Sequence, residues 1–320
     1  MKKIILGVLL SFILNIISGC TLSTGKNISN EVIKPSIKAA NYSLYYFAHR
    51  IVGEKMKVES LVPLGVDPHS WEPTPSDLVG LEKTSILLFN GAGMEDWIVK
   101  IADVLKNENL QVVNATEGIQ LLKGQGDNHG HGEDEKEKGQ EQEKFEEEFD
   151  PHVWLDPINS KVIAHNIKNA IIKEDPANED YYEENYYKLI KELDQLDKAF
   201  KEGLQDITRK EFIVNHAAFG YLAKRYGLIQ IPIMGINPHT EPTPKRMVEL
   251  INVTKEHKLK YIFTESLISS KVADVLAREA GINTKVLNPL GNLTKEDIEA
   301  GKDYFTIMYE NLMVLKEALK

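Results

Sequence analysis

The sequence predicts an α/β protein made of two similar lobes, each with a parallel β-sheet, joined by one long rigid helix. Three observations support this fold class. Short apolar runs alternate with helical patterns over most of the 320 residues. Similar segments recur in the two halves of the chain. Between the halves lies a single uninterrupted helical pattern.

The first 19 residues have the features of a signal peptide. Lys2 and Lys3 precede an apolar run at residues 4–17, and a helix of that length covers only about 21 Å, which is too short to span a bilayer. An uncleaved anchor is the alternative. Cys20 follows Ser18 and Gly19 and is the only cysteine, so no internal disulfide can form. The polar residues 20–35 are expected to act as a tether.

Residues 36–175 are expected to form the N-terminal lobe, with strands at 38–40, 58–64, 86–89 and 112–113. Gly53 ends the first helix. Thr74-Pro75 and Asp156-Pro157 each place a capping side chain before a proline, which is typical of a helix start.

A strongly acidic segment, residues 124–149, interrupts this lobe. From Asp127 to Asp150 there are eleven acidic residues against three lysines, so most of the net charge of -10 lies there. Such a composition cannot bury enough apolar surface to fold and predicts a flexible loop. The rest of the chain has no basic excess, and binding to nucleic acid is not expected.

Residues 176–206 are expected to form the linking helix, starting at Asp175-Pro176. It would be on the order of 40 Å long, without an internal proline to bend it. Its apolar side chains recur every three or four residues: Tyr182, Tyr186, Leu189, Leu193, Leu196, Phe200 and Leu204.

Residues 207–320 are expected to form the C-terminal lobe, with strands at 212–215, 229–234, 261–264 and 285–287. Thr243-Pro244 marks a helix start and Gly227 a helix end. Residues 211–227 have the same length as residues 37–53 and match them at an asparagine and at the final glycine. This match predicts that the two lobes are related by pseudo-symmetry, although coincidence between two strand–helix units is the alternative.

Candidate metal ligands follow several of these strands. His69 comes after the strand that ends near residue 64, His216 and Glu265 come at the ends of two strands of the second lobe, and His152 precedes a capped helix. Ligands of parallel α/β sheets bind beyond the carboxyl ends of the strands, so these residues are expected to meet in the cleft between the lobes. Three imidazoles and a carboxylate suit zinc.

The motif Asp-Pro-His-X-Trp occurs twice, at residues 67–71 and 150–154. Proline would stiffen each turn, and the aspartate would orient or charge-balance the histidine. Trp71 and Trp154 are expected to pack in the walls. A partial copy, Asn-Pro-His at residues 237–239, makes His239 either a fifth candidate or a relic of duplication.

The other histidines have weaker signals. His49, His165 and His257 lie within helical patterns and are expected on the surface or in packing contacts. His129 and His131, in the acidic loop, would collect metal only weakly among so many solvated charges.

Five segments together carry a family resemblance: GVDPHSWEPTPSDL, FNGAGMEDW, DPHVWLDP, HAAFGYLAKRYGL and YFTIMYENLMVLKEAL. From about residue 37 to the C-terminus the chain resembles the zinc-binding lipoproteins that serve as substrate-binding proteins of bacterial metal ABC transporters. The resemblance implies two α/β lobes joined by one long helix, and metal ligands at His69, His152, His216 and Glu265. It also implies lipidation of Cys20. The acidic loop stands where zinc-binding members carry a histidine-rich loop but has only two histidines, which departs from the pattern.

The resemblance implies an extracytoplasmic receptor, anchored to the membrane by lipid and expected to be monomeric, that captures Zn²⁺ as cargo and delivers it to an ABC transporter permease without catalysis. Relatives that prefer manganese or iron typically have a carboxylate at the position of His216 and Asp at the position of Glu265, whereas this chain has the zinc-type pair. A manganese or iron receptor is the alternative within the family. Outside the family, the alternatives are a zinc-dependent hydrolase and an adhesin. The sequence lacks an HExxH motif, which argues against the hydrolase.

Overall fold

The computed structural model describes residues 35–102, 109–124 and 149–320. The predicted signal peptide, Cys20, nearly all of the tether, most of the acidic loop, His129 and His131 lie outside the described residues. Within the described ranges, no helix is both long enough and apolar enough to span a membrane.

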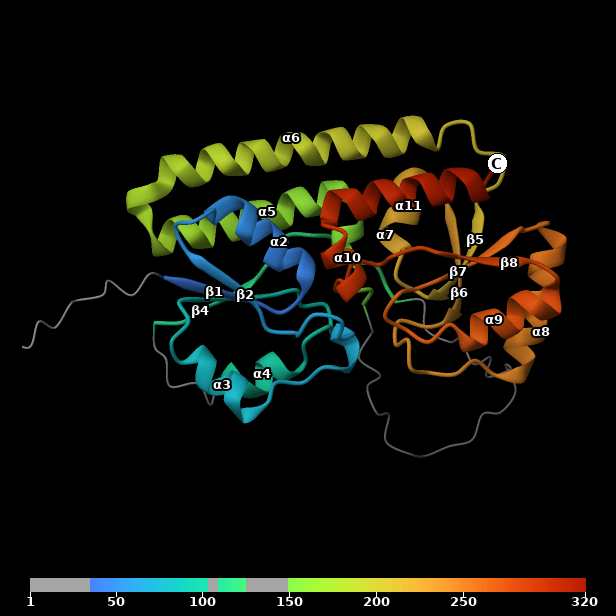
Figure 1. The fold of residues 1–320 in the computed structure, drawn as a ribbon, viewed down its shortest axis with the longest axis horizontal. Coiled ribbons are helices and arrows are strands. Elements are labelled where there is room, and N and C mark those ends of the chain that lie inside the picture. Colours follow the sequence, from blue (N-terminus) through green and yellow to red (C-terminus); the bar gives the residue numbers. More distant parts are fainter. Residues whose placement is uncertain (1–34, 103–108, 125–148) are drawn as a thin grey trace, which may run out of the picture. The chain divides into compact units, whose positions relative to one another are not determined.

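Two four-stranded parallel sheets of identical topology form the centre of Lys34–Lys320 (Figure 1). The strand orders are β2-β1-β3-β4 and β6-β5-β7-β8. In each sheet the chain forms an inner strand first, then the neighbouring edge strand, and then two strands on the other side of the first. All pairs are parallel. The strands are β1 (Ser36–Ala39), β2 (Lys57–Ser60), β3 (Ile86–Phe89), β4 (Gln111–Asn114), β5 (Glu211–His216), β6 (Ile229–Met234), β7 (Tyr261–Thr264) and β8 (Asn283–Val286).

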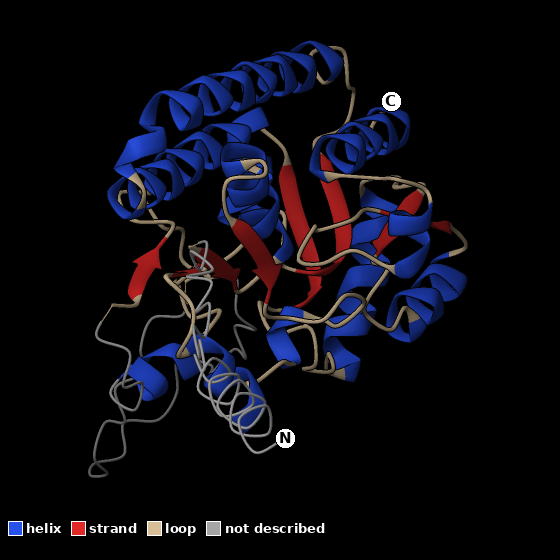
Figure 2. Cartoon of the chain, turned by 60° about the vertical axis from the view of Figure 1, so that its left-hand side comes forward, coloured by secondary structure: helices blue, strands red, loops and turns tan. Residues whose placement is uncertain are grey.

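Helices cover both faces of each sheet, as Figures 1 and 2 show. The α-helices are α2 (Tyr42–Val52), α3 (Pro75–Leu81), α4 (Trp97–Ala102), α5 (Pro157–Glu174), α6 (Glu179–Gly203), α7 (Gly220–Tyr226), α8 (Pro244–Glu256), α9 (Lys271–Ala280), α10 (Lys295–Glu299) and α11 (Tyr304–Ala318). Three short 3-10 turns are η1 (Pro68–Ser70), η2 (Val153–Leu155) and η3 (Pro176–Asn178).

One apolar core runs through both lobes. It joins strand residues of the first sheet, such as Ile37, to strand residues of the second, such as Phe212, through side chains of α2, α5, α6 and α11. The opposite face of each sheet has its own smaller cluster, beneath α3 and α4 in the first lobe and beneath α8 and α9 in the second. Because the lobes share a close-packed core, they cannot separate without exposing it.

The linking helix is confirmed but is shorter than predicted. α6 contains 25 residues, which corresponds to about 37 Å, and packs against α2, α5 and α11. The helical run begins at Pro176, as predicted, but its first three residues form the 3-10 turn η3, and α6 follows at Glu179. The Asp175 carboxylate accepts hydrogen bonds from the Tyr182 hydroxyl (2.6 Å) and the Asn178 amide (2.8 Å) instead of capping a helix.

The other helix starts follow the sequence. Thr74, Asp156 and Thr243 each cap a helix whose first residue is proline. The strand predicted at residues 58–64 ends at Ser60, because Leu61 makes the last backbone hydrogen bond to β1, at Ala39, and Pro63 has no amide hydrogen to donate. The chain thus leaves the sheet early, which frees residues 61–70 to form a loop beyond the carboxyl end of β2.

Candidate metal centre

Three turns of the same local design carry histidines. In each, the first residue's side chain accepts a hydrogen bond from the backbone N–H of the histidine two positions later: Asp67 to His69 (3.2 Å), Asp150 to His152 (2.9 Å) and Asn237 to His239 (2.9 Å). Proline at the central position restricts the backbone to such a turn. The repeated motif is therefore a device for holding a histidine at a loop.

Two of these turns and the end of β5 bring three imidazoles together. His69 Nε2 lies 3.0 Å from His152 Nε2, and His216 Nε2 lies 3.2 Å from His152 Nε2. Ligand atoms of the three residues all lie within 4.8 Å of one another. Two nitrogens bound to zinc at 2.0–2.1 Å in a tetrahedron are about 3.4 Å apart, so the spacing fits a single zinc ion with little movement.

Carboxylates hold two of the rings from behind. Asp150 Oδ1 lies 2.8 Å from His152 Nδ1, and Glu265 Oε1 lies 2.5 Å from His216 Nδ1. A carboxylate that accepts a hydrogen bond from Nδ1–H leaves Nε2 with the lone pair, which is the form that binds a metal. Both rings therefore present Nε2 to the same point.

Glu265 borders the same cavity as the three histidines but is not in the group of clustered ligand atoms. Its Oε1 also accepts the His216 backbone N–H at 3.2 Å, so this oxygen is committed to the far side of His216. Its Oε2 is buried and has no hydrogen-bond partner among the described residues. The structure brings the three predicted histidines together and places the predicted carboxylate behind one of them.

Burial and neighbouring charges shift the pKa values of the three rings in different directions. Burial and the adjacent imidazoles hold the pKa of His69 and of His152 well below the ordinary value. Burial also lowers the pKa of His216, but the charge and hydrogen bond of Glu265 outweigh it and raise that pKa above 6.5. Burial raises the pKa of Asp150 to about 7. His216 is therefore the ring that a proton occupies most readily.

Residues from both lobes enclose the centre. A cavity of about 20 Å³ adjoins the rings, enough for one water-sized occupant. Its wall includes Met94 of the first lobe and Gly291 of the second. A Cβ at Gly291 would lie 3.1 Å from Cγ of Pro68, so any other residue there would push the first histidine turn away by a few tenths of an ångström.

The loop after β8 pins the first lobe's histidine turns in place. The side-chain amide of Asn292 donates to the carbonyls of Pro63 (2.8 Å) and Val66 (3.0 Å). The indole N–H of the fully buried Trp154 donates to the carbonyl of Pro289 (2.8 Å). Nothing in the sequence indicated this role, because the loop has no apolar period and lies more than a hundred residues from its partners.

A second support comes from the Gly-rich segment at residues 91–94. The buried Glu95 carboxylate accepts hydrogen bonds from the backbone N–H groups of Asn90 and Gly91. The Asn90 side chain in turn donates to the carbonyl of Pro151 at 2.8 Å. This chain of contacts fixes the turn that carries His152.

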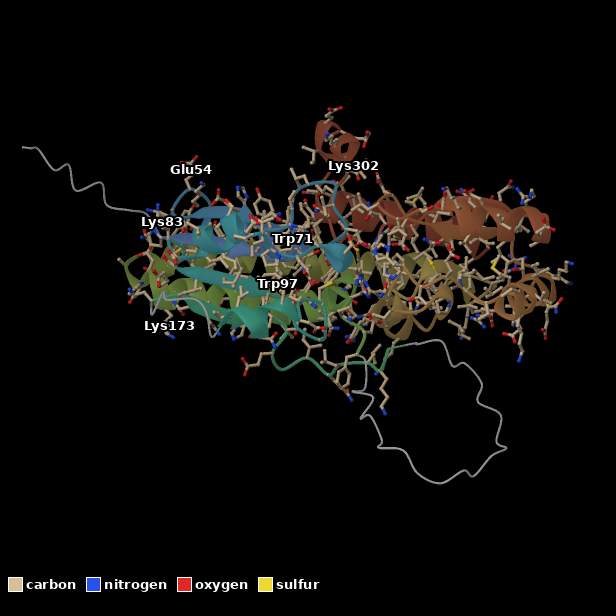
Figure 3. All side chains as sticks on the ribbon, turned by 90° about the horizontal axis from the view of Figure 1, so that it is seen from below. Glu54, Trp71, Lys83, Trp97, Lys173 and Lys302 are labelled. Atoms are coloured by element: carbon tan, nitrogen blue, oxygen red, sulfur yellow. The ribbon has the colours of Figure 1, made fainter. Side chains whose placement is uncertain are left out.

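The remaining predicted residues take peripheral positions. Trp71 packs edge-on against Trp97, with ring centroids 5.5 Å apart, and both lie in the same part of the first lobe (Figure 3). Both border an outer groove of about 320 Å³ that also touches His69 and Asn237. His49 and His165 are exposed, whereas the partly exposed His257 lies 3.7 Å from Glu211.

Comparison with protein families gives a match over most of the chain. Residues 37–318 match the model of the family described as ZnuA, zinc-uptake complex component A, periplasmic. The matched range includes all three histidines of the cavity and the carboxylates behind them.

Individual proteins of this kind are similar over most of the chain. The high-affinity zinc uptake system protein ZnuA of Bacillus subtilis (strain 168) is 42% identical over 278 residues, which cover 87% of this chain and 85% of that protein. The zinc-binding lipoprotein AdcA of Streptococcus pneumoniae (strain ATCC BAA-255 / R6) is 35% identical over 288 residues, and the match spans only 56% of AdcA.

A solved structure agrees with the fold. The crystal structure of the Zn(II)-bound ZnuA-like domain of S. pneumoniae AdcA superposes with a TM-score of 0.74 at 34% sequence identity, covering 89% of this chain and 99% of that domain.

Proposed function

Since the chain belongs to the ZnuA family of zinc-uptake components, we propose that it is a receptor that captures Zn²⁺ outside the cytoplasmic membrane and delivers it to the permease of an ABC transporter. One observation carries the proposal for this chain: the Nε2 atoms of three histidines from two lobes converge on one point. Zinc is the cargo of this site, and no chemical step is assigned to it.

In this proposal the ion is held by His69, His152 and His216. Asp150 and Glu265 keep the second and third rings in the tautomer and orientation that binding requires. Nitrogen donors favour zinc over manganese, which prefers oxygen ligands. We assign Glu265 as a positioning residue rather than as the fourth ligand, because its Oε1 is bonded to His216 Nδ1 and the residue is not in the group of clustered ligand atoms.

The shared core argues that zinc is released without wide separation of the two lobes. Separation of the lobes would break the apolar cluster that α6 and α11 help to form. We therefore assign release to small displacements of the loops around the cavity, brought about by docking to the permease. The protein acts as a monomer anchored through lipidated Cys20, which mass spectrometry and light scattering of the mature protein would test.

The decisive experiment measures bound metal. Elemental analysis of the protein purified from its own host, followed by zinc titration calorimetry, is compared with His152→Ala. The matched control is His165→Ala, because His165 is exposed on α5 and lies outside the group of clustered ligand atoms. The proposal requires about one zinc per chain in the parent and in the control, and loss of tight binding in His152→Ala. Equal affinity in all three proteins would refute it.

A further inference from the structure

The third histidine turn joins the two lobes beside the metal centre. His239 does not point its ring at the other imidazoles. Its Nε2 lies 3.1 Å from Oδ2 of Asp67, the residue that begins the first histidine turn. His239 follows β6 in the second lobe and Asp67 follows β2 in the first. The side chain of Asp67 is 9% exposed and that of His239 is 52% exposed, so the contact lies at the surface end of the site.

The position of this contact relates to the path of the ion. His152 and His216 are each only 1% exposed, whereas His69 is partly exposed. His69 is also the one of the three histidines that borders both the enclosed cavity and the outer groove. The outer groove therefore gives an ion from solvent a route to the cavity past His69. Asp67 shares the turn of His69, and Asn237, which begins the turn of His239, borders the outer groove.

We propose that the His239–Asp67 contact is a latch across this path and that it sets the rates at which zinc enters and leaves the cavity. The inference rests on the proposed zinc-receptor function. The contact ties together two loops of different lobes at the side where the ion passes, so they must part for the ion to move. Among the described residues, His239 is outside the group of clustered ligand atoms. Its loss therefore removes no ligand.

This arrangement predicts a kinetic effect without a change in affinity. A barrier that lies on the path in both directions slows association and dissociation equally, so removing it raises both rate constants and leaves their ratio unchanged. For a partly exposed contact between a histidine and a carboxylate, the expected increase is about two- to fivefold. A ligand would behave differently, because its loss would raise the dissociation rate and weaken affinity.

The test uses stopped-flow measurement of zinc binding and of zinc loss to excess chelator, with the full chain. The variants are His239→Ala, which removes the contact, and His239→Gln, which retains a side-chain hydrogen bond to Asp67. The control is His257→Ala. His257 stands at the end of α8, and its Nδ1 lies 3.7 Å from Oε1 of Glu211. Circular dichroism checks that each variant folds.

If the contact acts as a latch, zinc association and dissociation are both faster in His239→Ala than in the parent. The rates in His239→Gln and in His257→Ala stay near those of the parent. The dissociation constant is the same in all four proteins. Unchanged rates in His239→Ala would overturn the latch and leave the receptor function standing. Faster dissociation with weaker affinity would overturn it in favour of a ligand role for His239. A parent protein that binds no zinc would overturn both proposals.

Discussion

Replacement of Glu265 by glutamine distinguishes a positioning residue from a metal ligand. Glutamine has nearly the same volume and keeps an oxygen that can accept from His216 Nδ1, but it has no charge. The parent hydrogen bond, 2.5 Å long and buried, joins a carboxylate to an imidazole. Hydrogen bonds to charged groups contribute about 1.5–3 kcal/mol, which corresponds to about a 10- to 150-fold weakening of zinc binding if the whole contribution is lost.

The assay combines competition calorimetry with the visible absorption of Co²⁺ placed in the same site. If Glu265 only orients His216, Glu265→Gln weakens binding within that range and the Co²⁺ spectrum keeps the form of the parent, because the donor atoms are the same. Glu265→Ala should weaken binding further, since no acceptor remains for Nδ1. The reasoning fails if Glu265→Gln binds zinc within about twofold of the parent, or if its Co²⁺ spectrum shows that a donor atom has been lost.

Three further predictions follow from the same structure. The pKa of His216 is raised, while those of His69 and His152 are lowered. Zinc affinity should therefore be constant above the pKa of His216 and fall by about tenfold per pH unit just below it, because a proton on His216 competes with the ion. Calorimetry from pH 8 to pH 5 checks this, and a decline confined to pH below 5 would contradict it. Gly220→Ala would place a Cβ 2.5 Å from Asp150 Oδ2 and should weaken zinc binding, because it displaces the carboxylate behind His152. The control Gly80→Ala, whose Cβ would meet only Lys38 at 3.6 Å, should bind zinc as the parent does. Leu193→Ala should lower the free energy of unfolding by about 2–5 kcal/mol in urea titrations, because Leu193 of α6 is fully buried in the shared core; a loss below about 1 kcal/mol would show that α6 is not part of it.

Much of the fold could be read from local patterns in the sequence. Three strands, at residues 86–89, 229–234 and 261–264, agree residue for residue with the structure, because apolar runs of that length bounded by polar residues have few alternatives. The Thr-Pro and Asp-Pro helix starts at residues 74, 156 and 243 also agree. Capping is decided by residues next to one another in the chain. Asp175 also precedes a proline that begins a helical turn, but its carboxylate accepts hydrogen bonds from Asn178 and Tyr182 and caps no backbone N–H.

The sequence by itself determined the residue types of the site and the turns that present them, because the Asx-Pro-His motif defines its own geometry within three residues. Only the tertiary structure decided which side of each ring faces the cavity. Asp150 reaches the ring of His152 from two residues away, but Glu265 reaches His216 from a neighbouring strand, 49 residues later, and His239 reaches Asp67 across the two lobes, 172 residues away. These pairings depend on how the strands and lobes are packed in space, and the spacing of residues along the chain carries no record of that packing.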